Sequence, residues 1–244
     1  MSELQVFAVE GLPEIEAGTN LGELIATHTK LQEGDVVVIA QKAVSKAEDR
    51  VRQLGSVTPG AEARRLATAL DKDPALVELI LEESTEVLRA ERNILITETR
   101  HGFVCANAGI DSSNLPAPDT VCLLPEDPDA SARRIRAEIT VAVAVVIADS
   151  FGRAWRLGQT EVAIGCAGLT PLDDWRGRND AHGRKLEATM IAIADEAAAA
   201  ADLIRSKDSR VPVVIVRGLD RFVTTDDGPG AIVLRRLPAE DLFR

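Results

Sequence analysis

The sequence predicts a mixed α/β protein, because short apolar runs rich in β-branched residues alternate with helical stretches that begin at proline. Three runs, at 36–40, 141–148 and 211–216, have the length and composition of strands buried on both faces. A chain of 244 residues that is 45% hydrophobic can bury a substantial core. No internal repeat or linker divides it, so we expect one domain over residues 1–244, which could be built from two intertwined subdomains.

The first half of the chain contributes a strand, a helix, a buried strand, two helices and a hairpin. Thr58-Pro59 and Asp73-Pro74 each place a good N-cap residue before a proline, which is typical of a helix start. In order, the predicted elements are a strand at 3–9, a helix at 21–29, the strand at 36–40, helices at 59–70 and 74–84, and paired strands at 93–99 and 102–106.

The second half surrounds the longest apolar strand. Asp127-Pro128 predicts a further helix start, and an alanine-rich stretch suits close packing in a core or a subunit interface. In order, the predicted elements are a helix at 128–138, the strand at 141–148, an apolar run at 162–169, a long helix at 185–205, the strand at 211–216 and a short strand after residue 226.

Composition excludes several classes of function. The net charge of −11 disfavours a nucleic-acid partner, and the apolar runs are far shorter than a membrane span. Only 3% of residues are aromatic, which argues against base stacking. The three cysteines show no disulfide or zinc pattern, so we expect them to be reduced and mostly buried, in a cytoplasmic protein.

Polar residues follow the buried strands where those strands end. Asp149 and Ser150 follow the strand at 141–148, and Lys42 and Lys46 follow the strand at 36–40. Strand ends are where mixed α/β proteins usually hold their chemistry, although lysines are more often simply solvated. We therefore take Asp149 as the centre of the candidate site.

A second carboxylate is offered by Asp111, within the polar stretch 107–114. Such a composition is equally well explained as a turn whose side chains bond their own backbone. Two carboxylates with hydroxyls would nevertheless suit a hard divalent cation that carries phosphates. The sequence contains neither the GxxxxGK[ST] nor the GxGxxG motif, so neither standard nucleotide-binding loop is present.

Several motifs occur together in one order: GLPEI, QKAVSK, CANAGIDSSN, LLPEDPDASARRIR, ADSFGRAWRLGQTEVAIGCAGL and PVVIVRGL. Over essentially the whole chain this pattern resembles the coenzyme F-420-0:γ-glutamyl ligase family. The resemblance implies a GTP-dependent amide ligase that adds L-glutamate to coenzyme F-420-0 and then extends it through γ-links. It also implies a family-specific fold of mixed sheets and packed helices, distinct from Rossmann, P-loop and ATP-grasp folds, and a homodimer.

The resemblance further implies roles for individual residues. Asp111 and Asp149 match metal ligands, Ser150 matches a ligand to a second ion, and the ions would be Mg²⁺ or Mn²⁺, with K⁺ as a further candidate. The positions that match GTP contacts are Leu12, Pro13, Glu14, Ile15, Gln41, Lys46 and Asn114. This sequence departs from the family pattern at two positions. Gln41 stands where a serine is common. Lys207 stands where some members carry an acidic residue near the metal, and this second departure weighs against a full two-metal site.

The chemistry of the residues agrees with a ligase. Activation of a carboxylate by GTP proceeds through an acyl phosphate, and catalysis then rests on positioning and on neutralising the transferring phosphoryl group. Asp111, Asp149 and Lys46 are the candidate catalytic residues, and we assign Arg153 and Arg156 to substrate carboxylates or to the phosphodiester of the acceptor. A metal-dependent phosphohydrolase and a non-catalytic nucleotide-binding regulator remain the alternatives.

Overall fold

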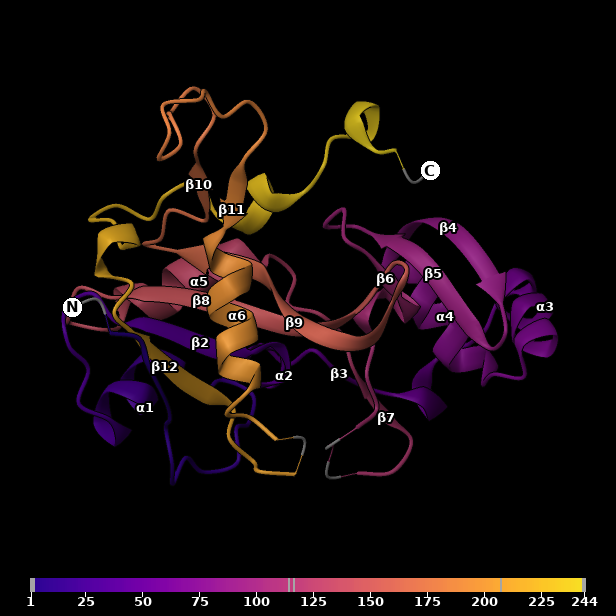
Figure 1. The fold of residues 1–244 in the computed structure, drawn as a ribbon. Coiled ribbons are helices and arrows are strands. Elements are labelled where there is room, and N and C mark those ends of the chain that lie inside the picture. The colour runs from indigo at the N-terminus through magenta and orange to yellow at the C-terminus, as the bar shows by residue number, and fades with distance from the viewer. Residues whose placement is uncertain (1–2, 114, 116, 207, 243–244) are drawn as a thin grey trace.

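A five-stranded mixed sheet forms the centre of the protein in the computed structural model, which describes residues 3–113, 115, 117–206 and 208–242 (Figure 1). The strand order is β1-β12-β2-β8-β9. Strands β2 and β8 run parallel, and the other neighbouring strands of this sheet run antiparallel. The mixed α/β class predicted from the sequence is confirmed. The strands are β1 (Gln5–Ala8), β2 (Val36–Ala40), β8 (Ala144–Arg153), β9 (Arg156–Ala167) and β12 (Val213–Arg217).

Helices cover both faces of this sheet. Val37 and Ile39 of β2 pack on one face, in the core that includes α1 (Leu21–His28), α2 (Gln41–Ala47) and α5 (Pro128–Ala137). Val36 and Val38 point to the other face, where α6 (Ile193–Asp202) packs. Because alternate side chains of β2 enter two different cores, its sequence is apolar throughout rather than alternating.

A second unit is inserted in the connection from β2 to β8, and it lies to one side of the main sheet (Figure 1). It has its own core, which includes Leu66, Ile80 and Leu95. Whether it makes one domain with the main sheet stays a prediction. Its elements are β3 (Val51–Gln53), the 3₁₀ turn Leu54–Ser56, α3 (Ala61–Leu70), α4 (Pro74–Glu82), β4 (Ser84–Glu91), β5 (Ile94–Thr99), β6 (Val104–Ala106), the 3₁₀ turn Asn107–Gly109 and β7 (Thr120–Cys122).

Three predicted elements differ from the structure. The strand expected to end at Ala148 continues to Arg153, because its polar half pairs with β9 in a long hairpin. The helix expected over 185–205 is confined to α6, because β11 (Met190–Ala192) pairs with β10 (Leu172–Asp174). The short strand expected in the tail is absent from the described residues. A 3₁₀ turn at Ala231–Leu234 follows instead, with the amides of Ala231 and Ile232 donating to the Asp129 carboxylate.

The alanines of α6 serve the chain's own core. Ala194, Ala197, Ala198 and Ala201 are buried against the sheet, so this surface is not available to a second subunit. Cys105, Cys122 and Cys166 are free and buried, as the sequence predicted. Two further 3₁₀ turns, Asp220–Phe222 and Pro238–Glu240, complete the elements. None of the helices in the described ranges has the length and apolar character needed to cross a membrane.

Candidate active site

A cavity of about 1040 Å³ opens where the parallel strands β2 and β8 lead out of the core. The carboxyl ends of adjacent parallel strands meet at one edge of a sheet, so the residues that follow them converge there. Two further walls come from the loop at 12–15 and from residues 105–115 of the inserted unit. The last wall is formed by β9 and by the segment 202–212 that follows α6.

The structure brings most of the predicted site residues to this one cavity. Those that line it are Leu12, Pro13, Glu14, Ile15, Gln41, Lys46, Asp111, Asp149 and Ser150. Asn114 and Lys207 lie outside the described residues. Arg153 and Arg156 do not line the cavity, because they flank the turn of the β8–β9 hairpin, and Arg153 there donates to the backbone oxygens of Leu157 and Gly158.

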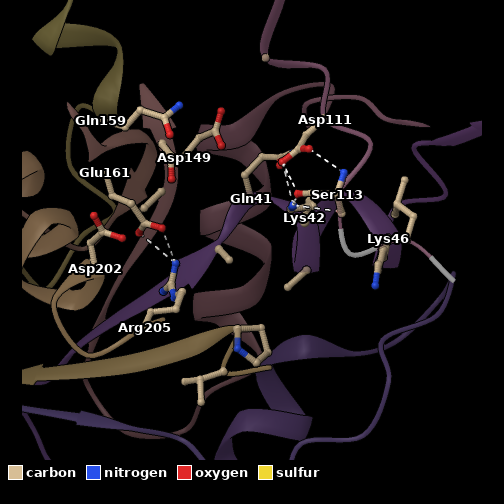
Figure 2. Close-up of a pocket in the computed structure, with 18 of the residues that line it drawn as sticks. Gln41, Lys42, Lys46, Asp111, Ser113, Asp149, Gln159, Glu161, Asp202 and Arg205 are labelled. Atoms are coloured by element: carbon tan, nitrogen blue, oxygen red, sulfur yellow. Dashed lines mark hydrogen bonds and ion pairs between the residues drawn. The ribbon is translucent and has the colours of Figure 1, made fainter. Parts of the chain in front are cut away.

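Asp111 is held by a lysine and a serine at one end of the cavity (Figure 2). Lys42 Nζ lies 2.8 Å from Asp111 Oδ2, and Ser113 donates from its backbone nitrogen at 2.7 Å and from its hydroxyl at 2.9 Å. Burial opposes ionisation, but these hydrogen bonds and the lysine charge outweigh it and hold the pKa of Asp111 below its ordinary value. Asp111 is therefore an ionised carboxylate with a cation already beside it.

Asp149 lies within β8 rather than in a loop after the strand, and the residue is only partly buried in the cavity wall. Burial raises the pKa of Asp149 to about 7, and the negative charges of Asp111 and Glu161 raise it further against a hydrogen bond from the Ser150 backbone. The charge of Lys42 offsets only part of this rise. A raised pKa of this kind is typical of a carboxylate with too little positive charge around it, and a bound cation would add that charge.

Helix α2 places two lysines on the cavity wall, four residues apart and therefore on the same helix face. Lys42 pairs with Asp111, and Lys46 pairs with Glu14 at 2.5 Å. Gln41 is buried, and its amide nitrogen donates to Ser45 Oγ and to the backbone oxygen of Leu123, both at 2.9 Å. The helix is thereby fixed to the segment that follows β7.

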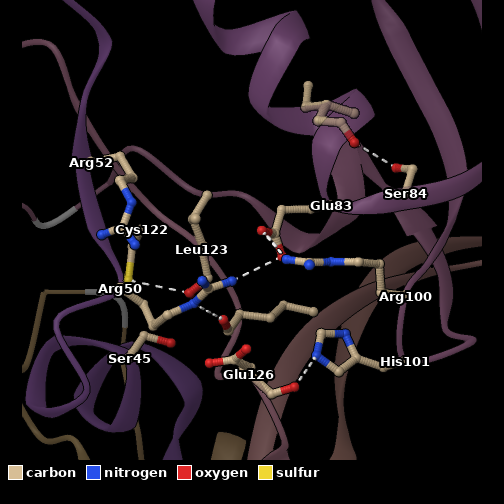
Figure 3. A network of polar contacts seen from close by, with 12 residues as sticks. Ser45, Arg50, Arg52, Glu83, Ser84, Arg100, His101, Cys122, Leu123 and Glu126 are labelled. Carbon is tan, nitrogen blue, oxygen red and sulfur yellow. Dashed lines mark hydrogen bonds and ion pairs between the residues drawn. The ribbon is translucent and has the colours of Figure 1, made fainter. Parts of the chain in front are cut away.

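A charged network secures the same segment from the other side (Figure 3). The buried Glu83 carboxylate pairs with Arg50 at 2.9 Å and with Arg100 at 2.5 Å, and Arg50 also donates to the backbone oxygen of Leu124. Cys122 forms a backbone bridge with Asp111, in which each amide donates to the carbonyl of the other residue. The position of Asp111 therefore depends on the contact between the inserted unit and α2.

Sequence reasoning missed five charged residues that line the cavity: Glu161, Asp202, Arg205, Asp208 and Arg210. Two of them, Glu161 of β9 and Arg205 after α6, form an ion pair. Arg205 Nη1 lies 2.9 Å from both carboxylate oxygens of Glu161. Glu161 stands directly opposite Ser150 in the β8–β9 ladder. For Glu161, the one signal in the sequence was its position just before the apolar run at 162–169. That signal can be interpreted only when the register of the β8–β9 hairpin is known.

The acidic residues fit a magnesium-like ion that keeps part of its water shell. Among the residues that the structure describes, no three His, Cys, Asp or Glu side chains are grouped closely enough to form a complete metal cage. Asp111 and Asp149 offer carboxylate oxygens to the same cavity (Figure 2). Ser150, the next residue of β8, also lines it. Mg²⁺ is commonly bound by one or two carboxylates together with water and substrate phosphates, which matches this donor set.

Comparison with known proteins gives one consistent result. The model of the family described as F420-0:Gamma-glutamyl ligase matches residues 11–218. A protein named coenzyme F420:L-glutamate ligase from Methanothermobacter thermautotrophicus is 43% identical over 252 residues, covering 99% of both chains. Proteins of the same name from Methanopyrus kandleri and Halobacterium salinarum are 43% and 44% identical, covering 100% and 88% of this chain and 100% and 87% of their own.

Proposed function

This chain belongs to the F420-0:gamma-glutamyl ligase family, and we propose that it joins L-glutamate to coenzyme F420-0 in the biosynthesis of coenzyme F420. The observation that carries the proposal is a 43% identity that extends over 99% of this chain and of the relative from Methanothermobacter. The cavity supports this proposal, because nine of the site residues implied by the family resemblance line it.

The proposed reaction uses GTP to activate a carboxylate. An oxygen of the acceptor carboxylate attacks the γ-phosphorus, GDP leaves, and an acyl phosphate forms. The amine of L-glutamate then attacks the acyl carbon, loses a proton and displaces inorganic phosphate, which leaves the amide. Further rounds on the γ-carboxylate of the product would extend the chain with γ-linked glutamates.

The residues of this chain would act on charge and position. Lys42 and Lys46 each carry a positive charge on the cavity wall, and each now pairs with a carboxylate that a phosphate could replace. The loop at 12–15 would lie against the nucleotide, opposite α2. Asp111, Asp149 and Ser150 would hold Mg²⁺ or Mn²⁺, and such an ion neutralises the phosphate oxygens during transfer.

We further propose that the enzyme works as a homodimer in the cytoplasm. Three buried free cysteines suit a reducing compartment. The turn of the β8–β9 hairpin leaves Trp155 and Leu157 81% and 97% exposed, and large apolar side chains at such a projecting position suit a protein contact.

The decisive experiment incubates the purified chain with F420-0, GTP and L-glutamate and analyses the products by mass spectrometry. We expect F420-0 to gain the mass of glutamate residues, with GDP released only when acceptor and glutamate are both present. GTP hydrolysis without either substrate would favour a metal-dependent phosphohydrolase. Nucleotide binding without any turnover would favour a regulator.

A further inference from the structure

The wall of the cavity away from Lys46 carries a buried ion pair that the proposed phosphoryl transfer does not use (Figure 2). The side chains of Glu161 and Arg205 are only 6% and 9% exposed. Fixing two charges in so little water costs free energy that the pair itself recovers only in part. Such a pair in a cavity wall calls for a functional explanation.

Arg205 has hydrogen-bonding capacity left over. Its Nη1 donates to Glu161, and its Nη2 makes a long contact of 3.3 Å with the backbone oxygen of Val38. Its buried Nε has no hydrogen-bond partner within the residues that the structure describes. A buried donor without an acceptor is unfavourable, and a guanidinium is well matched to a carboxylate. The arginine therefore points to a ligand that brings a carboxylate.

The surroundings of Arg205 are acidic. Glu161, Asp202 at the end of α6, and Asp149 all line the cavity near it (Figure 2). Three carboxylates close to one guanidinium disfavour a ligand that is only negative, such as a phosphate, and favour one that also carries a positive group. An α-amino acid has this combination, with an ammonium and a carboxylate on the same carbon.

We propose that Arg205, Glu161 and Asp202 form the subsite for L-glutamate, with Arg205 receiving the α-carboxylate and the two acidic side chains receiving the α-ammonium. The proposal rests on the ligase function proposed above. The adjacent charges of the ligand match the adjacent charges of the Glu161–Arg205 pair. Because Glu161 faces Ser150 across the hairpin ladder, the amine would lie beside the end of the cavity where the acyl phosphate forms.

This assignment replaces the one made from the sequence. Arg153 and Arg156 were expected to hold substrate carboxylates, but both lie at the hairpin turn and outside the cavity wall. Arg205 was expected only as the last residue of a long helix, yet it is the arginine that the fold buries beside the candidate site.

The test measures the KM for L-glutamate in the full chain and the binding of two analogues by calorimetry. Glutarate lacks the amine, and 4-aminobutyrate lacks the α-carboxylate. Arg205→Lys keeps the charge but loses the planar fork, so we expect it to raise the KM for L-glutamate about tenfold or more. The KM for GTP should stay within about twofold, and 4-aminobutyrate should bind as it does to the wild type. Glu161→Gln should weaken L-glutamate and leave glutarate unchanged.

Arg153→Lys is the matched control, and it should leave the KM for L-glutamate unchanged. An unchanged value in a folded Arg205→Lys variant, or an increase caused by Arg153→Lys instead, would overturn the subsite. So would a parallel rise in the KM for GTP. If Arg205→Lys does not fold, Glu161→Gln and the two analogues decide the matter. If the wild type binds L-glutamate through Arg205 but forms no amide, the subsite holds and the ligase proposal fails.

Discussion

At one end of the cavity the charged side chains come from a short helix and a loop and remain partly exposed, whereas at the other end they are buried. The side chains of Asp111 and Lys42 are 44% and 24% exposed, against 6% and 9% for Glu161 and Arg205. Exposed pairs contribute little to stability and can be exchanged at low cost. Buried pairs are fixed, because separating them leaves an uncompensated charge. The first end is thus suited to phosphates and ions that come and go, and the second to recognising one shape of ligand.

The largest expected effect concerns two aspartates, Asp111 of the exchangeable end and Asp149 of β8. Asp111→Asn or Asp149→Asn should preserve the fold and lower the rate of ligation by about 10²-fold or more, since each removes a charge that holds the ion on the transferring phosphate. Product formation and circular dichroism of each variant provide the measurement. Near-normal turnover in a folded variant would refute the metal assignment.

Substitution of Lys46 should have a smaller effect, limited to the binding of GTP. Lys46→Ala is expected to weaken GTP binding by about 1.5–3 kcal/mol, the usual loss for a hydrogen bond to a charged group. Lys30→Ala is the matched control, because Lys30 is exposed and does not line the cavity. Calorimetry should find GTP bound by Lys30→Ala as tightly as by the wild type. Equal affinities for the wild type and Lys46→Ala would show that Lys46 does not contact the nucleotide.

Asp149 also predicts a dependence of stability on pH. Its pKa rises from an ordinary 3.8 to about 7 in the folded protein, so between these values the folded state binds a proton that the unfolded chain has lost. The free energy of unfolding therefore falls as the pH rises through this window.

In metal-free buffer the Asp149→Asn variant should lack this decrease in the free energy of unfolding. The free energy of unfolding of the variant minus that of the wild type should therefore be more positive at pH 8 than at pH 5. The difference should be at least about 1.4 kcal/mol, the equivalent of one pKa unit. Urea unfolding at both pH values gives the measurement, and a constant difference between variant and wild type would contradict the raised pKa.

Dilution of the protein tests whether a second copy of the chain is needed to complete the more exposed end of the cavity. If the active unit is a dimer, specific activity should fall in step with dimer content as the chain is diluted. Light scattering and activity over one concentration range measure both quantities. Trp155→Ser should shift the loss of activity to higher concentration if the hairpin turn forms the contact. A fully active monomer would show that one chain builds the whole site.

Much of the candidate site could be predicted from the sequence, because its residues lie at the ends of apolar strands or a few residues after them. Asp111, Asp149 and Lys46 all line the cavity. The buried end could not be predicted, since it depends on pairing between distant segments. Glu161 reaches the cavity wall only because of the register in which β8 pairs with β9. Arg205 reaches it only because α6 ends at Asp202, three residues earlier.

The same limit explains the misassigned elements. Residues 185–192 have good helix formers, but pairing of β11 with β10 overrides that preference. Asp149 was expected in a loop because polarity changes abruptly after Ala148. This change in polarity instead marks the point where one continuous strand, β8, leaves the core and continues into the hairpin.

The position of the inserted unit has a consequence for how the chain acquires its structure. Strand β2 lies between β12 and β8, both of which come much later in the sequence, and β1 pairs with β12 as well. Closing such long loops slows folding, although prior folding of the inserted unit would shorten the effective loop. During synthesis on the ribosome, the apolar β2 segment therefore stays without either neighbour until β8 has emerged. A chain that stalls before that point exposes an unpaired aggregation-prone strand.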